Sequence, residues 1–224
     1  MGHTDQVATV LRPGIRTFKP RRSRITPRQL RALQGAQNSH GPLISLEGLD
    51  AVWASPRPVV LDIGFGSGRP VVELAQTFPD STILAIDVHT PGIGDLVDLI
   101  TTESLENVFV MESDALEILT QLPGQLSGIR SFFPDPWPKA RHHKRRLVQP
   151  AVINAVTQVV APGGFWHVAT DWAEYAESIC AAFDADATWS GGVIERPSWR
   201  PVTHFERRAI REGRPSVDMW FERK

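Results

Sequence analysis

Short apolar runs alternate with amphipathic segments along the chain from position 59 onward. An apolar run that ends in glycine or an acid is typical of a buried parallel strand. Runs of this kind predict strands at 59–63, 82–86, 107–111, 128–133 and 165–170. Alternating apolar and polar residues predict a last strand at 217–222. A turn is expected at Pro162-Gly163-Gly164, just before the fifth of these strands.

The segments between the predicted strands carry apolar residues at helical spacing. Val71, Val72, Ala75 and Phe78 mark a helix over 69–78, with Pro70 in its first turn. Further helices are expected over 93–100, from Asp114 through 122, up to about 160 and over 172–183. Alternation of strand and helix predicts an α/β fold, with a parallel sheet and helices on both faces. Ligands of such sheets bind at the carboxyl ends of the strands.

The first 55 residues lack this periodicity and are rich in Arg, Pro, Gly and Ser. We interpret 1–55 as a mobile basic arm, with a short helix beginning at Thr26, a good N-cap before Pro27. Residues 56–224 are then expected to form the α/β domain. The arm is not predicted to have a core of its own.

Charge is unevenly distributed, although the net charge is only −1. Positions 1–31 hold eight basic residues and one acid, and positions 139–146 hold five basic residues and no acid. The rest of the chain holds 11 basic and 24 acidic residues. Two basic clusters on an acidic body indicate a polyanionic partner bound at a defined place. A solvated basic tail is the alternative for the first cluster.

Composition excludes several classes of protein. The longest apolar runs are too short to span a membrane, and no signal peptide is evident, so we expect a cytoplasmic protein without a membrane partner. The one cysteine, Cys180, lies on the apolar side of a predicted helix and is expected to be packed there. One thiol forms no internal disulfide and no Cys-rich zinc site, and no metal is expected. The sequence does not distinguish a monomer from a homodimer.

The loop after the first strand, Asp62-Ile63-Gly64-Phe65-Gly66-Ser67-Gly68, has the spacing G-x-G-x-G. A dinucleotide fingerprint requires a third glycine at 69, which is Arg69, so a dehydrogenase is disfavoured. Glycines allow the backbone to turn tightly and to approach a ligand closely. Because S-adenosyl-L-methionine carries a sulfonium and no phosphate, Asp62 suits its cationic end.

Acids also follow the next strands. Asp87 is placed to accept hydrogen bonds from the ribose hydroxyls of a nucleoside. Asp114 is placed to meet an adenine amine, or only to cap the helix that follows it. We expect Asp62, Asp87 and Asp135 to surround one cavity.

The fourth strand leads into Pro134-Asp135-Pro136-Trp137-Pro138, a loop made stiff by three prolines. Asp135 and Trp137 would thereby be held where a substrate base lies, and Trp137 could stack on that base. The basic run at 139–146 follows directly. A base-sized pocket beside phosphate-binding charge is expected of an enzyme that modifies nucleic acid.

With these residues the chain resembles the bacterial tRNA (guanine-N7)-methyltransferases. The resemblance covers 59 to the end, together with Arg16-Thr17-Phe18. Its Phe-Pro-Asp-Pro-Trp loop with the basic run is highly specific, whereas the glycine loop occurs in many methyltransferases. The segments that carry it are 63–68, 88–92, 132–137, 139–146, 169–172 and 200–207.

The resemblance implies a Rossmann-like class I methyltransferase fold, with a mostly parallel, doubly wound sheet and an antiparallel strand near the C-terminus. It implies transfer of a methyl group from S-adenosyl-L-methionine to N7 of the guanine at position 46 in the variable loop of tRNA. The products are 7-methylguanosine and S-adenosyl-L-homocysteine.

The resemblance also implies the roles of single residues. Asp135 would be catalytic. Cofactor contacts are implied at Asp62, Gly64, Gly66, Gly68, Asp87, Asp114 and Asp135. Substrate contacts are implied at Lys139, Asp171, Thr203, His204, Phe205 and Glu206, and RNA contacts at Arg141, His142, His143, Lys144, Arg145 and Arg146.

Some features depart from the family or have simpler interpretations. Asp62 and Asp87 stand where members commonly have Glu, and Pro70 is unusual. Thr203-x-x-Glu206 is also a capping box, and Asp171 could merely cap the helix after it. The alternative functions are methylation of adenine, of another guanine position or of a protein side chain, and RNA binding by a protein with a vestigial site.

Overall fold

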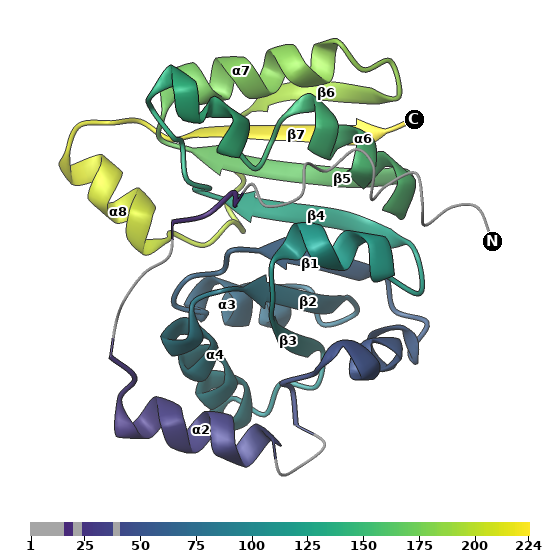
Figure 1. Ribbon diagram of the computed structural model, residues 1–224, viewed down its shortest axis with the longest axis vertical. Coiled ribbons are helices and arrows are strands. Elements are labelled where there is room, and N and C mark those ends of the chain that lie inside the picture. The colour runs from purple at the N-terminus through teal and green to yellow at the C-terminus, as the bar shows by residue number, and fades with distance from the viewer. Residues whose placement is uncertain (1–15, 20–23, 38–40) are drawn as a thin grey trace.

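A computed structural model describes residues 16–19, 24–37 and 41–224 of the 224-residue chain. Its described residues form one seven-stranded sheet in the order β3-β2-β1-β4-β5-β7-β6 (Figure 1). The strands from β3 to β5 pair in parallel, and β7 runs antiparallel to both β5 and β6. The predicted α/β class, the mostly parallel sheet and the antiparallel strand near the C-terminus are therefore confirmed.

The predicted strands are present with small changes at their ends. Asn107 precedes its strand and is buried, where its side-chain amide donates to the backbone oxygens of Ala75, Phe78 and Ser81. The expected turn at 162–164 lies inside a long strand, at the place where pairing with its neighbour is irregular. The strands are β1 Val59–Ile63, β2 Thr82–Asp87, β3 Val108–Glu112, β4 Leu126–Phe132, β5 Val160–Thr170, β6 Trp189–Ile194 and β7 Val217–Arg223.

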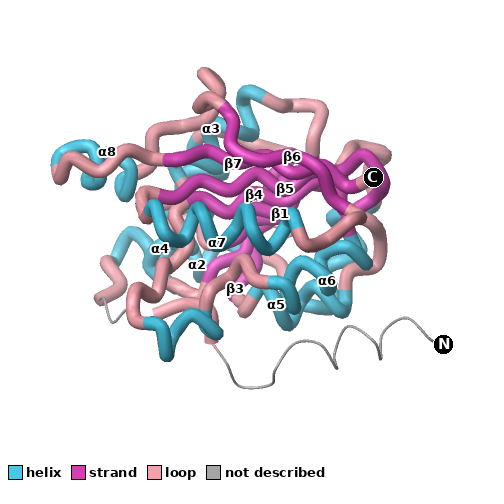
Figure 2. The backbone as a smooth tube through the Cα atoms, turned by 90° about the horizontal axis from the view of Figure 1, so that it is seen from above, coloured by secondary structure: helices cyan, strands magenta, loops and turns pink. Residues whose placement is uncertain are grey.

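Helices cover both faces of the sheet (Figure 2). One apolar core lies between the sheet and α3 (Arg69–Thr77) and α4 (Thr90–Thr102). The other core lies under η1 (Leu46–Trp53), α5 (Ala115–Ile118), η2 (Leu119–Gln121), α6 (Pro150–Val159) and α7 (Ala173–Asp184). Cys180 packs at the border of this second core, as expected. No helix in the described ranges has the length and apolarity that a membrane span requires.

Four elements were not predicted: the 3-10 helices η1 and η3 (Ala140–Arg145), the strand β6 and the helix α8 (His204–Arg211). The segment of η1 was expected to belong to the mobile arm, but its Leu49 and Val52 are buried. The strand β6 contains Gly191 and Gly192 and is largely exposed, so it lacks the apolar alternation that marks a strand. The helix α8 buries only Glu206 and Ala209 along its length. In Figures 1 and 2 it extends beyond the ends of the strands. Only Phe205, Ala209 and Ile210 are apolar among its residues, and its amphipathic contrast comes mainly from charged side chains.

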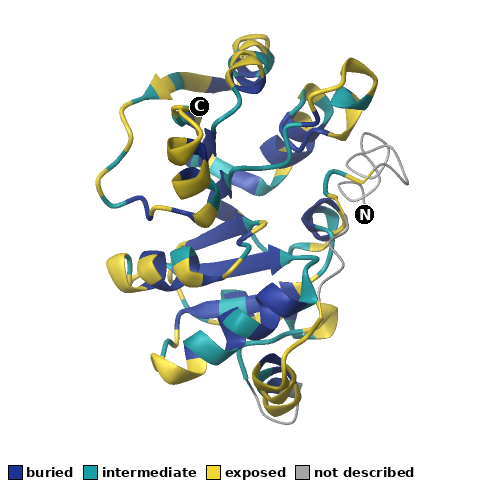
Figure 3. Ribbon diagram, turned by 90° about the vertical axis from the view of Figure 1, so that its left-hand side faces the viewer, coloured by how far each residue is buried: buried dark blue, intermediate teal, exposed yellow. Residues whose placement is uncertain are grey.

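The helix expected near Thr26 is present as α2 (Pro27–Gln37), which packs against α4. The side chain of Gln29 donates to Asp95 on α4 over 3.0 Å, and Arg28 pairs with Asp95 and Asp98. Figure 3 shows the outward side of α2 exposed. Part of the predicted arm thus lies on the domain, while Arg12, Arg21 and Arg22 fall outside the described residues. The division into arm and domain stays a prediction.

Candidate functional site

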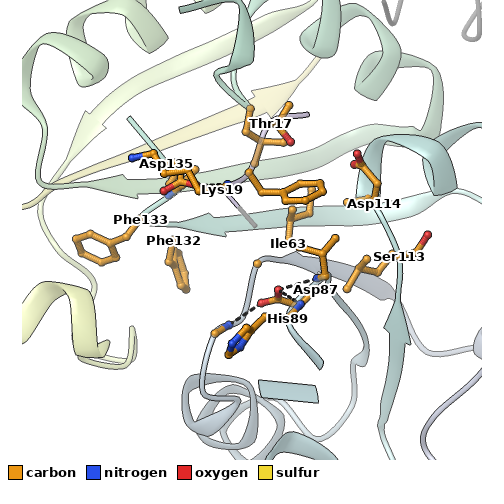
Figure 4. Close-up of a pocket in the computed structure, with 18 of the residues that line it drawn as sticks. Thr17, Lys19, Ile63, Asp87, His89, Ser113, Asp114, Phe132, Phe133 and Asp135 are labelled. Atoms are coloured by element: carbon orange, nitrogen blue, oxygen red, sulfur yellow. Dashed lines mark hydrogen bonds between the residues drawn. The ribbon is translucent and has the colours of Figure 1, made fainter. Parts of the chain in front are cut away.

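A pocket opens at the carboxyl ends of the central strands (Figure 4). Asp87, Asp114 and Asp135 all line it, although they follow three different strands. Figure 4 shows Asp135 beside Lys19, with Asp87 and Asp114 at other parts of the wall. The rest of the lining is mostly apolar or aromatic and includes Phe18, Ile63, Ile86, Phe132, Leu147 and Phe205. This combination of apolar surface and a few convergent polar groups suits a nucleoside-like ligand.

The glycine loop forms one wall of this pocket. Gly64 and Gly66 line it and have φ angles of 76° and 65°, in the left-handed region that favours glycine. At Gly92 a Cβ atom would lie 2.1 Å from the carbonyl oxygen of Gly66, so the start of α4 also requires glycine. Gly68 has a positive φ as well and precedes α3, but it lines neither cavity of the site.

Asp87 holds the glycine loop against the end of β2. Its Oδ2 accepts a hydrogen bond from the amide of Gly66 over 2.9 Å. Its Oδ1 accepts from the amides of Val88 and His89 over 2.7 and 3.0 Å. A ribose diol bound here would share these oxygens with three backbone amides. The position of Asp87 is therefore compatible with the predicted contact with the cofactor. Asp87 also has a second role, which is to shape the glycine loop.

Asp114 combines the two interpretations given for it. Its Oδ1 accepts from the amide of Leu116 over 3.0 Å and caps α5, and its side chain also lines the pocket. Burial raises the pKa of Asp114, while the bond from Leu116 opposes the rise. Capping and ligand contact are compatible at this position.

Asp135 lies in a strained loop. Phe133 and Trp137 have φ angles of 55° and 46°, which non-glycine residues seldom adopt. The amide of Phe133 donates to the carbonyl of Ala169 over 2.7 Å and fixes the start of the loop. The Oδ2 atom of Asp135 accepts from the backbone amide of Lys19 over 2.8 Å. A stiff loop placing Asp135 at the pocket agrees with the interpretation of the three prolines.

The expectation that Trp137 stacks on a substrate base is wrong for this structure. Trp137 is only 6% exposed and does not line the pocket. Its indole nitrogen donates to the carbonyl of Thr17 over 3.1 Å. Its ring is contacted by the cationic groups of Lys19 and Arg145, at 5.1 and 4.9 Å from the ring centroid. The ring is thus occupied by the protein itself, and Phe18 and Phe205 provide the aromatic walls instead.

Asp62 departs from the expected arrangement. It lines a smaller cavity and does not line the larger pocket. The two cavities adjoin, because Gly64, Gly66, Phe132 and Phe205 line both. Burial raises the pKa of Asp62 to about 6; Arg130 opposes this rise and Asp87 adds to it. Its contact with the cofactor stays a prediction and requires a ligand that extends into the second cavity.

The segment from Thr203 to Phe205 forms the far wall of the smaller cavity. Thr203 is the N-cap of α8, and its hydroxyl accepts from the amide of Glu206 over 3.0 Å. The Glu206 side chain does not return to complete a capping box. It is buried and accepts from Arg200, Arg196 and Ser216. Glu206 therefore does not face a substrate here, contrary to its implied role.

Two other implied substrate residues lie outside both cavities. Asp171 accepts from Arg214 over 2.9 Å, and the N-cap of α7 is Trp172, so Asp171 is not that helix's cap. Lys139 is exposed and begins the basic segment. The structure therefore does not bring these two predicted substrate residues to the pocket.

The basic segment is η3 (Ala140–Arg145), a short 3-10 helix beside the Asp135 loop. Lys139, Arg141, Lys144 and Arg145 are exposed, which keeps them available as predicted RNA contacts. Partial burial and the neighbouring cations lower the pKa of His142, so it adds little charge at neutral pH. Arg146 is 2% exposed and donates to Glu174 and to the carbonyl of Pro136. Its implied contact with RNA is thus not open in this structure.

The pocket residues that sequence reasoning did not select are mainly Thr17, Phe18 and Lys19. The only signal was that Arg16-Thr17-Phe18 looks similar to the family's arm. Their neighbours at 20–23 are outside the described residues. Among the described residues no group of three or more His, Cys, Asp or Glu side chains is arranged to hold a metal.

Comparisons with known proteins bear on the family and the fold. Residues 56–219 match the family Methyltransf_4, described as "Putative methyltransferase". A tRNA (guanine-N(7)-)-methyltransferase of Streptomyces coelicolor is 42% identical over 93% of this chain and 81% of its own length. One of Alkalilimnicola ehrlichii is 42% identical over 100% of this chain and 98% of its own. The crystal structure of the 16S rRNA methyltransferase KamB matches with a TM-score of 0.58 at 15% identity, over 81% of this chain and 94% of that one.

Proposed function

The chain belongs to the tRNA (guanine-N7)-methyltransferase family, and we propose that it transfers a methyl group from S-adenosyl-L-methionine to N7 of guanine 46 in the variable loop of tRNA. One observation carries the proposal. Asp87, Asp114 and Asp135 converge on one pocket, walled by the glycine loop and bordered by exposed cations. The products would be 7-methylguanosine and S-adenosyl-L-homocysteine.

The pocket residues fit such a cofactor. The apolar side chains of Ile63 and Ile86, which directly precede Gly64 and Asp87, line the pocket, and Phe18 adds an aromatic wall. Asp87 and Asp114 offer carboxylate oxygens to hydroxyl and amine donors. When bound, the cofactor supplies an electrophilic methyl group on a sulfonium.

The reaction requires no general base, because N7 of guanine carries a lone pair and no proton. The protein's contribution is then positioning and electrostatics. Asp135 either stabilises the positive charge that develops on the purine or accepts hydrogen bonds from its N1 and N2 donors. Its carboxylate is oriented for this by the Lys19 amide and the strained loop.

Exposed cations of η3 next to this loop suit the phosphates of a folded RNA. Lys139, Arg141, Lys144 and Arg145 would hold the tRNA backbone while the base enters the pocket. Methylation of adenine is the nearest alternative function. It would require the amino group of adenine to be positioned in the same pocket.

The test is incubation of the purified protein with labelled S-adenosyl-L-methionine and bulk tRNA that lacks 7-methylguanosine, followed by nucleoside analysis. Label in 7-methylguanosine, absent with Asp135→Ala and absent with tRNA lacking guanine at position 46, is the expected result. Label in another nucleoside would replace the proposed specificity. No label in any nucleoside, with intact cofactor binding, would reject the activity.

A further inference from the structure

Arg130 on β4 is a buried cation that neither the fold nor the pocket lining explains. It is 4% exposed, and its Nε and Nη1 atoms have no hydrogen-bond partner among the described residues. Its guanidinium lies against two aromatic rings, 5.3 Å from the centroid of Phe78 and 5.8 Å from that of Trp199. A buried charge is costly unless an opposite charge compensates for it. The position of the compensating charge therefore reveals the role of Arg130.

Asp62 is the acid directly beside Arg130 in the sheet. The two residues are register partners on the parallel strands β1 and β4, and both are buried. Residues paired in this way point to the same face of a sheet, so Asp62 and Arg130 share the face that carries α3 and α4. The charges that act on the Asp62 carboxylate are those of Arg130, which favours its ionised form, and of Asp87, which opposes it. Arg130 is therefore the cation that compensates for the buried charge of Asp62.

His204 is the other ionisable side chain that lines the smaller cavity with Asp62. The ionisable groups near Arg130 itself are already compensated. On β5 its register partner is His167, whose pKa is lowered by burial and which is therefore neutral at pH 7. The Nε2 atom of His167 lies 2.9 Å from Asp218, and Asp218 also accepts from Arg200 over 3.0 Å. On β2, Asp87 is engaged by three backbone amides. Asp62 is the remaining described carboxylate that Arg130 can neutralise.

We propose that Arg130 is a positioning residue of the cofactor site. It supplies the buried countercharge that keeps the Asp62 carboxylate ionised toward the smaller cavity, where the cofactor's ammonium group binds. This inference rests on the proposed cofactor, and it gives the second cavity a chemical class of occupant: a cationic amino-acid end. Because the pKa of Asp62 is already about 6, the fraction ionised at neutral pH depends strongly on Arg130.

The probe is S-adenosyl-L-homocysteine, which keeps the ammonium group and lacks the sulfonium, with binding measured by calorimetry from pH 5 to pH 9. For the unsubstituted protein we expect the affinity to fall as the pH drops below about 6. Arg130→Gln should move this midpoint upward. A rise of one unit, to about 7, would weaken binding at pH 7 by about twofold, and each further unit would weaken it by a factor approaching ten. Binding at pH 9 should be nearly unchanged, and Arg130→Lys should restore most of the affinity at pH 7.

A double-mutant comparison separates this role from a structural one. If Arg130 acts through Asp62, then Arg130→Gln should have no further effect on affinity in an Asp62→Asn background. Arg223→Gln removes a hydrogen-bonded arginine at the far end of β7 and is the matched control, with no expected change in the pH midpoint. If Arg130→Gln does not fold, Arg130→Lys serves in both backgrounds, and any affinity change it causes must vanish with Asp62→Asn.

The outcomes are distinct. An equal loss of affinity at every pH, or an equal loss in the Asp62→Asn background, would overturn the role of Arg130. Binding by the unsubstituted protein without dependence on pH would also overturn it, while leaving the proposed function intact. No binding by the unsubstituted protein at any pH would count against the proposed cofactor itself.

Discussion

The backbone amide of Lys19 donates a hydrogen bond of 2.8 Å to Oδ2 of Asp135, across 116 positions of sequence. A second bond, from the Trp137 indole to the Thr17 carbonyl, joins the same two segments. The segment 16–19 thereby lies over the pocket, with Phe18 in its lining. Figure 1 shows this segment beside the end of β4. Part of the N-terminal arm is thus a component of the candidate site.

Trp137→Phe tests this connection, because it keeps an aromatic ring and removes the donor to Thr17. We expect kcat/KM for tRNA to fall by about three- to tenfold, the range of one ordinary hydrogen bond. Trp53→Phe is the matched control, since its indole also donates to a backbone oxygen, that of Gln125, away from the pocket. Equal losses in the two variants would argue against a specific role for the segment 16–19.

Asp62→Asn should stabilise the folded protein at pH 8. The folded-state pKa of about 6 lies above the ordinary 3.8, so below pH 3.8 the carboxyl is protonated in both states. As the pH rises from 3.8 to about 6, the carboxyl loses its proton in the unfolded chain before it does so in the folded protein. The free energy of unfolding therefore decreases by as much as about 3 kcal/mol. The amide avoids this cost. Melting temperatures at pH 4 and pH 8 should therefore differ between the two proteins mainly at pH 8.

The same variant should bind S-adenosyl-L-homocysteine more weakly at pH 8, since it has no charge to offer the ammonium group. Higher stability with lower affinity is the expected trade-off at a binding site. A variant that is less stable than the unsubstituted protein at pH 8 would contradict the assigned pKa direction.

Glu206→Gln should affect stability more than substrate binding. Burial alone would raise the pKa of Glu206, but the bonds from Arg200 and Arg196 outweigh it and lower the pKa. The stabilisation is therefore present above the ordinary pKa of 4.5 and is lost as the pH falls below it. Because the substitution leaves buried Arg200 without full compensation, we expect a loss of about 3 kcal/mol at pH 7. Denaturant titration measures this loss, which should shrink toward pH 4.

Thr203→Ala is the comparison for Glu206→Gln. It removes only the cap of α8 and should cost about 1 kcal/mol. If Glu206→Gln instead raised KM for tRNA with unchanged stability, Glu206 would be a substrate contact, as the family resemblance implies.

The exposed basic residues of η3 should contribute to tRNA binding. Replacing Arg141, Lys144 and Arg145 by Ala should weaken tRNA binding and reduce the slope of log affinity against log salt by about one for each phosphate that the variant no longer binds. The melting temperature should stay the same for Arg141 and Lys144, whose side chains are exposed, and decrease slightly for Arg145, which also contacts the Trp137 ring. Filter binding at several salt concentrations provides the measurement.

Arg146→Ala should have the opposite profile. Its side chain bonds Glu174 and the Pro136 carbonyl beneath the Asp135 loop, so the melting temperature and turnover should decrease. The salt slope of tRNA binding should change little. A reduced slope with normal stability would show that Arg146 does reach the RNA.

Local sequence pattern was sufficient for six of the seven strands and for much of the pocket. Apolar runs and helical spacing identify the strands from β1 to β5 and the strand β7, since burial on both faces requires such runs. The rule that ligands bind at carboxyl strand ends then places Asp87, Asp114 and Asp135 together. These features depend on neighbours in sequence and on general topology, which a single chain reveals.

Only the tertiary structure decided which side chains are free to meet a ligand. Trp137 and Arg146 are of residue types that often contact RNA, but both form hydrogen bonds within the protein instead. The segment 16–19 reaches the pocket through bonds spanning more than a hundred residues, and Asp62 opens to a neighbouring cavity beside a buried cation. Residue type determines which interactions a side chain can make. Distant packing determines which of them it does make, and no local period records that choice.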